Sequence, residues 1–385
     1  MWTSNCFRFG SLPAFALDQN EQFGATELRT PLFYWMSAVE DNLVFWRNRA
    51  CFGFSNSNAR LVVWRKLLGS PSLPKPQSHK YRTQILKDVP RCLQEYNLTD
   101  IERHRDRLEF ILDSVCGALA GEGLCYIQGL HEVVAIVMLA LKEQPDEEII
   151  EMAVTLCVTR LRDALLPSLD VVMNQLNLLF FLVGSADKQL ERFLKQSGIN
   201  PVFALSWTLT WFAHTIPDLE TCIRVFDFLV ASPPAMSLYM AAGLLLLESK
   251  QIQALECDYA EIHGHFKNFP VQHFTNNEFP MLCDLAIRLY VDLPPWELWK
   301  LNSAPYRYVG KRSSVLKMAS ERFLEDLGVY DVWKREGKGS PSSFMHRHQK
   351  LIVYLIIPVF LALTISFALY RGKASSSRPR DPHLA

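Results

Sequence analysis

The stretch from Tyr81 to Val134 decides how this sequence is interpreted, and it begins with Ile85-Leu-Lys-Asp88-Val-Pro-Arg91. Asp88 precedes Arg91 by three residues, which is about one helical turn. We therefore expect the Asp88 carboxylate to hold the root of the Arg91 guanidinium in place. Pro90 fixes the backbone immediately before the arginine.

The same stretch ends with a glutamine in Tyr126-Ile-Gln128-Gly129. Gly129 has no Cβ, so another chain can approach the backbone closely at this point. The apolar run from Val133 to Leu139 then predicts a helix buried behind Gln128.

An arginine and a glutamine together indicate one kind of chemistry. Besides a grip on the phosphates and Mg²⁺, GTP hydrolysis needs a positive charge at the transferring phosphoryl group and a group that orients the attacking water. Arg91 and Gln128 have the side chains for these two roles. Neither residue is informative alone, since most arginines and glutamines are solvated surface residues.

The two motifs, taken in order, resemble the paired signature of TBC domains, which are GTPase-activating proteins for Rab GTPases. Three further segments agree with that family in order and spacing, and the resemblance covers roughly residues 59 to 300. Within the family, the sequence is most similar to the membrane-anchored subgroup that acts between the endoplasmic reticulum (ER) and the Golgi. The three further segments are Arg60–Gly69, Phe203–His214 and Arg224–Leu229.

The resemblance implies an all-α domain of two helical subdomains at residues 57–302. It also implies that Arg91 and Gln128 are inserted in trans into a GTP-bound Rab, with Asp88, Tyr126 and Gly129 in support. Such a protein is an activator and not itself an enzyme, and it needs no cofactor of its own because the Rab holds GTP and Mg²⁺.

The sequence departs from the family pattern at two places. Cys92 follows the arginine where a threonine is common, and His131-Glu132 stands where Asn-Asp or His-Asp is usual. Two other functions stay open at this stage. One is a Rab-binding scaffold without catalysis on the ER membrane, and the other is a helical membrane protein in which the arginine and the glutamine are coincidental.

Composition excludes several classes of protein. The chain has 385 residues, of which 49% are hydrophobic, so it is long and apolar enough to form a large core. Its 40 basic and 40 acidic residues give a formal charge of zero, which does not favour nucleic-acid binding. Nine cysteines without regular spacing argue against a zinc site or a disulfide framework and favour reduced thiols in the cytosol. His263-Gly-His265 lacks partners at ligand spacing, so we predict no metal site.

Hydrophobic periodicity predicts helices throughout, and no segment alternates with period two, so the fold is expected to be all-helical. A first helix, from Asn58 to Leu68, is predicted to end at Gly69, and a longer one begins at Thr99 or Asp100 and stops at Gly121. The other predicted helices are residues 81–88, 130–143, 146–162, 171–183, 186–196, 203–215, 219–230, 235–250, 258–268, 274–290 and 295–302.

Two pairs of residues are interpreted as structural. Trp207 and Trp211 are four residues apart on one face of a predicted helix and are expected in the core. Arg224 and Asp227 are three residues apart in an apolar helix and are expected to form an ion pair.

The ends of the chain differ from its middle. Residues 1–56 show aromatic residues without a clear period, and we expect a poorly ordered or peripheral segment. From Lys300 to Lys350, eleven lysines and arginines stand against five acids. The predicted linker at residues 303–350 is therefore basic, and it fits both attraction to anionic lipid and a merely solvated tether.

Residues 351–370 are twenty residues without a charge, between Lys350 and Arg371. This length matches a hydrocarbon core of about 30 Å, so we predict one transmembrane helix there. A short polar tail follows at residues 371–385. The expected protein is tail-anchored, with the bulk of the chain on the cytosolic side of the ER or early Golgi membrane.

Overall fold

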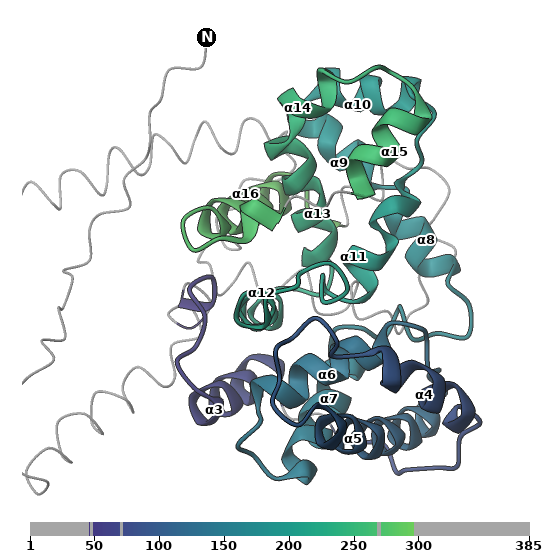
Figure 1. Ribbon diagram of the computed structural model, residues 1–385. Coiled ribbons are helices and arrows are strands. Elements are labelled where there is room, and N and C mark those ends of the chain that lie inside the picture. The colour runs from purple at the N-terminus through teal and green to yellow at the C-terminus, as the bar shows by residue number, and fades with distance from the viewer. Residues whose placement is uncertain (1–45, 47–48, 70–71, 268–270, 296–385) are drawn as a thin grey trace, which may run out of the picture. The chain divides into compact units, whose positions relative to one another are not determined.

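The computed structural model describes residues 46, 49–69, 72–267 and 271–295, and every regular element among them is a helix (Figure 1). The prediction of an all-helical fold is confirmed for these residues. The sequence predictions for residues 1–45, 296–302, the 303–350 linker, the 351–370 span and the 371–385 tail lie outside the described part. Within it, no helix combines the length and the apolar character that crossing a membrane requires.

The helices form two groups along the chain (Figure 1). In the first group α5 is the central element, because α4, α6 and α7 pack against it. This group consists of α3 (Ser57–Leu68), α4 (Arg82–Asp88), the 3-10 helix η1 (Val89–Arg91), α5 (Ile101–Gly121), α6 (Leu130–Ala140) and α7 (Asp146–Thr159).

In the second group α13 is central and packs against α9, α11 and α16, whereas α12 packs against α3 and α6 of the first group. The elements of this group are α8 (Asp170–Leu176), α9 (Leu179–Ala186), α10 (Lys188–Gln196), η2 (Pro201–Ala204), α11 (Leu205–Leu209), α12 (Leu219–Ala231), α13 (Met236–Leu247), α14 (Ser249–Gln253), α15 (Tyr259–Lys267), η3 (Val271–Phe274) and α16 (Phe279–Asp292).

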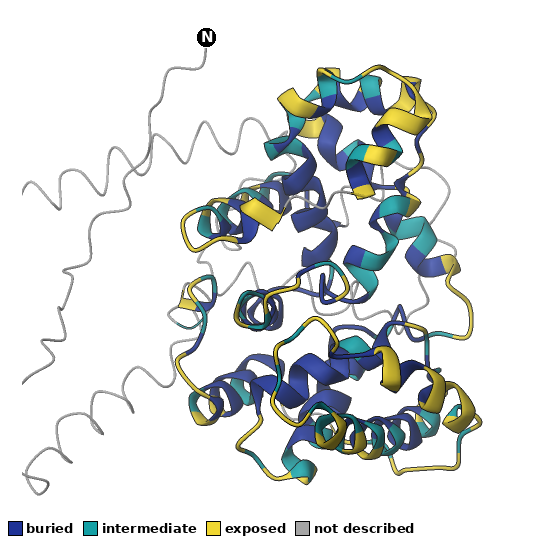
Figure 2. Ribbon diagram, viewed as in Figure 1, coloured by how far each residue is buried: buried dark blue, intermediate teal, exposed yellow. Residues whose placement is uncertain are grey.

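The burial of each helix follows its sequence pattern (Figure 2). α6 and α13 are apolar on all sides, and nearly all of their residues are buried. α3 is amphipathic and begins at Asn56, whose side-chain oxygen accepts a hydrogen bond from the Ala59 amide at 2.9 Å. It ends at Gly69, which has a φ of 77°, so the predicted glycine cap is confirmed.

Asp227 of α12 is fully buried and joins three segments of the chain. Its carboxylate accepts hydrogen bonds from the Arg60 guanidinium at 2.8 and 3.0 Å, from the Trp64 indole at 2.8 Å and from the Phe54 amide at 2.9 Å. Burial raises the pKa of Asp227, and the Arg60 guanidinium opposes that shift. This carboxylate therefore fixes α12 against α3.

The predicted ion pair between Arg224 and Asp227 is wrong. Arg224 donates instead to the Phe274 carbonyl and the Asn276 side chain, and its guanidinium lies 4.9 Å from the centre of the Phe279 ring. The sequence spacing suggested a local pair, but Asp227 faces α3 and is taken by Arg60.

The prediction of one helix at residues 203–215 is also wrong for the second half of that range. α11 ends at Leu209, and Trp211 and Phe212 adopt positive φ angles of 52° and 67°. The chain turns sharply there, with the Phe212 amide donating to the Trp207 carbonyl at 2.9 Å. Trp207 and Trp211 are nevertheless buried, as predicted.

Smaller differences concern helix boundaries. The predicted helix at 171–183 is divided into α8 and α9, and the one at 235–250 is divided into α13 and α14. The helix predicted from residue 274 begins at Phe279, after η3.

We predict that replacing Arg60 by Met lowers the free energy of unfolding by about 3–5 kcal/mol, because it leaves the buried Asp227 carboxylate without its charge partner. Chemical denaturation of the full chain measures this change. The matched control is Asp284→Asn, which breaks the exposed Asp284–Arg288 pair of α16 and should cost less than about 1 kcal/mol. Equal effects of the two substitutions would contradict the role given to Asp227.

Candidate functional site

Arg91 is the last residue of η1, and its side chain is exposed. The backbone around it is fixed by its neighbours, since Val89, Cys92 and Leu93 are all buried. Pro90 lies in the first turn of η1, as its fixed φ allows. Among the described residues, the Arg91 guanidinium has no hydrogen bond or ion pair. It therefore projects from a fixed backbone and is available to a partner.

Gln128 stands two residues before the start of α6, and its side chain is exposed too. The turn that carries it is closed by a hydrogen bond from the Leu130 amide to the Ile127 carbonyl at 3.1 Å. A second bond, from the Cys125 amide to the Leu165 carbonyl at 2.7 Å, fixes the start of this segment. Behind it lies the predicted buried helix, now observed as α6.

One hydrogen bond joins the two segments that carry Arg91 and Gln128. The Tyr126 hydroxyl donates to the buried Asp88 carboxylate at 2.7 Å, and the Gln84 amide donates to the same oxygen at 2.9 Å. The prediction that Asp88 holds the Arg91 guanidinium is therefore wrong, because Asp88 bonds to Tyr126 and Gln84 instead. Asp88 supports the site by binding the glutamine segment (residues 125–132) to the arginine segment (residues 82–96).

His131 extends this buried network. Its Nδ1 lies 3.1 Å from the Tyr126 hydroxyl. The Gly129 amide donates to the same nitrogen at 3.4 Å, so Nδ1 lies within hydrogen-bond distance of both the Tyr126 hydroxyl and the Gly129 backbone. Burial lowers the pKa of His131, which keeps the ring neutral near neutral pH. Burial, together with the bond to Asp88, raises the pKa of Tyr126, so its hydroxyl keeps its proton.

Gly129 is required at its position for two reasons. Its φ is 102°, which disfavours any residue with a Cβ, and a Cβ built there would lie 2.9 Å from the Thr210 Cγ2. We expected Gly129 to admit a partner chain, but the close approach comes from this chain's own Thr210. Thr210 and the turn that follows it belong to the segment Phe203–His214, but their position beside Gly129 was not predicted, because no motif spacing links them to Gln128.

The two exposed side chains are carried by segments that one hydrogen bond joins. Arg91 follows Asp88 by three helical residues, which advance about 5–6 Å, and Gln128 follows Tyr126 by two residues, which span at most about 7 Å. Both side chains therefore start a short distance from the 2.7 Å bond between Asp88 and Tyr126. A positive group and an amide are thus exposed on two segments that this bond joins.

Cys92, where the family more often has threonine, is a packing residue. Its side chain is buried, and burial raises the pKa of the thiol to about 12. A protonated, buried thiol is neither a nucleophile nor a metal ligand. The departure therefore does not change the chemistry that Arg91 can offer.

Comparison with known proteins agrees with this fold. The Rab-GTPase-TBC domain model matches residues 57–253, which is just over half of the chain. TBC1 domain family member 20 of Homo sapiens is 30% identical over 275 residues, covering 69% of this chain and 66% of that protein. The Bos taurus protein of the same name is 30% identical and covers 64% and 62%, and GTPase-activating protein gyp10 of Schizosaccharomyces pombe is 27% identical and covers 69% and 75%.

Two solved structures share the fold. The Ypt/Rab-GAP domain of Gyp1p aligns with a TM-score of 0.52 at 19% identity, covering 66% of this chain and 96% of that domain. A flagellar RabGAP TBC domain from Chlamydomonas aligns with the same TM-score at 17% identity, covering 66% and 90%.

The helical fold, with an exposed arginine and an exposed glutamine on linked segments, is that of a TBC domain. The chain belongs to the Rab-GTPase-TBC domain family. Its matched part spans about three fifths of the length of the mammalian relatives named above.

We predict that Gly129→Ala lowers the free energy of unfolding by about 1–3 kcal/mol, because it adds a disfavoured φ to a steric clash with Thr210. Thermal or chemical denaturation measures the loss. Adding Thr210→Ser removes the clashing methyl group and should restore part of the stability. Gly123→Ala is the control, since Gly123 has a φ of 70° with open space around it and should show only the backbone cost.

Proposed function

We propose that this chain is a GTPase-activating protein for a Rab small GTPase, to which it supplies Arg91 and Gln128 in trans. The observation that carries the proposal is the Tyr126–Asp88 hydrogen bond at 2.7 Å, which unites the two segments bearing these exposed side chains. Membership of the TBC family and the relative named as a GTPase-activating protein support it.

The role proposed for Arg91 is to stabilise negative charge in the transition state of GTP hydrolysis. During phosphoryl transfer, negative charge spreads over the oxygens of the γ-phosphoryl group, and an inserted guanidinium stabilises it. The guanidinium is permanently charged and presents several N–H donors, and at Arg91 it makes no hydrogen bond or ion pair in the described residues that would have to break first. Since η1 and the buried residues beside it fix the backbone, insertion orders only the side chain.

The role proposed for Gln128 is to orient the water molecule that attacks the γ-phosphorus. Its amide oxygen accepts a hydrogen bond from the attacking water and its amide nitrogen donates, so one side chain can orient the water toward the phosphorus. Gln128 is placed for this by the turn before α6, whose first residues are bound to Gly129 through backbone hydrogen bonds at 3.1 and 3.3 Å. GTP and Mg²⁺ are brought by the Rab, so this chain needs no cofactor of its own.

The setting of this activity is part of the proposal. The uncharged segment at residues 351–370 would anchor the chain in a membrane, with the 57–302 domain on the cytosolic side. The proposed place of action is ER and Golgi traffic, as the sequence resemblance implied. The Rab would then be met on the membrane surface.

We predict that Arg91→Ala lowers Rab GTP hydrolysis by about 10³- to 10⁵-fold relative to the unsubstituted chain, because the transition-state charge loses its counterpart. Gln128→Ala is expected to abolish most of the stimulation as well. Single-turnover hydrolysis with a panel of GTP-loaded Rabs and the full chain measures both effects, and melting curves should remain those of the unsubstituted protein.

The matched controls are Arg192→Ala and Gln189→Ala, which remove the same side chains from the exposed surface of α10. Both should retain full stimulation. A chain that binds a GTP-loaded Rab without stimulating hydrolysis would support the scaffold alternative. Full stimulation by Arg91→Ala or Gln128→Ala would overturn the assigned mechanism.

A further inference from the structure

The turn at residues 210–214 contacts both segments of the site. The His214 Nδ1 lies 2.8 Å from the Glu132 carboxylate of the glutamine segment, and Thr210 packs against Gly129. On the other side, the Tyr96 hydroxyl of the arginine segment donates to the Ala213 carbonyl at 3.4 Å. This turn is therefore a third part of the site, more than 70 residues further along the chain than Glu132.

The turn is held in a costly conformation. Trp211 and Phe212 both have positive φ angles, and each costs roughly 1–2 kcal/mol relative to ordinary backbone. Their side chains are buried, with the Trp211 ring 5.4 Å from Phe226 and the Phe212 ring 5.6 Å from Phe274. Packing in the core therefore enforces the turn and fixes the backbone of His214.

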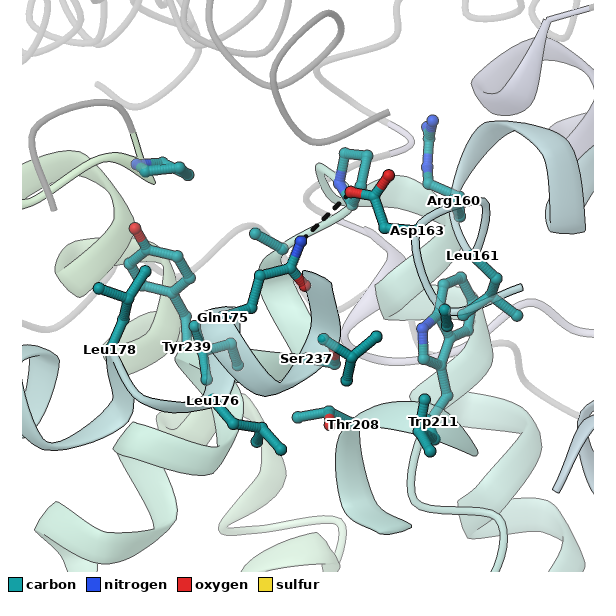
Figure 3. A pocket seen from close by; sticks show the side chains of 17 residues that line it. Arg160, Leu161, Asp163, Gln175, Leu176, Leu178, Thr208, Trp211, Ser237 and Tyr239 are labelled. Carbon is teal, nitrogen blue, oxygen red and sulfur yellow. Dashed lines mark hydrogen bonds between the residues drawn. The ribbon is translucent and has the colours of Figure 1, made fainter. Parts of the chain in front are cut away.

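Behind the turn lies a small cavity, to which Trp211 and Thr208 contribute side chains (Figure 3). Its volume is about 50 Å³, room for one or two water molecules. On its far side the Gln175 amide donates to the Asp163 carboxylate at 3.2 Å. The cavity is too small for a nucleotide.

Glu132 stands in the first turn of α6, four residues after Gln128. One carboxylate oxygen is bound by His214, and the other is buried without a hydrogen-bond partner in the described part of the chain. His214 thus provides the one side-chain hydrogen bond found there for a carboxylate that is 19% exposed. Losing it would leave the same oxygen only the longer contact to the His131 Nε2, at 3.8 Å, and would allow water into the start of α6.

We propose that His214 is a positioning residue for Gln128, acting through Glu132 to fix the first turn of α6 and with it the glutamine amide. The proposal rests on the GTPase-activating function argued above. It requires no contact between His214 and the nucleotide. A displacement of about 1 Å in a catalytic group is enough to cost on the order of 100-fold in rate, so a modest loosening of this turn would be measurable.

Three charged or titratable groups face His214, namely Glu132, Glu95 and His131. The hydrogen bond to Glu132 raises the pKa of His214 above its ordinary value of about 6.5. The ion pair between His214 and Glu132 is therefore fully formed below a pH of about 6.5, and it weakens as the pH rises through the raised pKa of His214. Stimulation of hydrolysis should fall over the same pH range.

The test is a pair of substitutions in the full chain, measured with a Rab that the unsubstituted chain activates. His214→Ala should lower kcat roughly 10- to 100-fold with little change in KM. His214→Asn keeps an N–H donor near the position of Nδ1 but does not titrate. It should restore most of the kcat and remove the decline in activity at higher pH.

His263→Ala, on α15 and away from the site, is the control and should leave kcat, KM and the pH profile unchanged. Equal kcat values for His214→Ala and the unsubstituted chain would overturn the positioning role. So would a His214→Asn profile that still falls with pH. If instead the unsubstituted chain activates no Rab, the proposed function fails, and this outcome is distinct from a failure of the His214 proposal.

Discussion

The site depends on one buried carboxylate. Asp88 is almost entirely removed from solvent, and one of its carboxylate oxygens accepts hydrogen bonds from both Tyr126 and Gln84. An unpaired carboxylate in such a place would cost several kcal/mol, so the hydrogen bonds that satisfy it are not optional. Because Tyr126 is 38 residues away in sequence, satisfying Asp88 forces the two segments of the site together. Arg91 and Gln128 lie within these two segments, and both are exposed.

A second buried carboxylate, that of Asp227, likewise joins segments that are far apart in the sequence. Asp227 holds α12 against α3 by accepting from Arg60 and Trp64, across 167 and 163 residues of sequence. α12 also packs against α6, the helix behind Gln128. The apolar core gives the domain its stability, and these two polar centres select which segments lie beside one another. Long-range polar contacts inside a helical scaffold therefore join the segments that carry Arg91 and Gln128.

The local structure was predictable from the sequence where local rules suffice. The glycine that ends α3 follows from capping, and the extent of α5 and the buried character of α6 follow from hydrophobic periodicity. The partners of Asp88, Arg224 and Asp227 were not predictable, because helical spacing suggests a neighbour three residues away while tertiary packing supplies another. The same holds for Trp211 and Phe212, whose positive φ angles run against the preferences of large side chains and are imposed by the core. For this reason the contribution of Thr210 and His214 to the site appeared only in the structure.

The most direct test of the central claim is a double-mutant cycle between Asp88→Ala and Tyr126→Phe, read as the rate of GTP hydrolysis by an activated Rab. If the bond between them aligns the arginine and the glutamine segments, either substitution alone removes that alignment. The double variant should then be no slower than the slower single variant. Two independent losses that multiply in the double variant would contradict the account, because each residue would then act without the other.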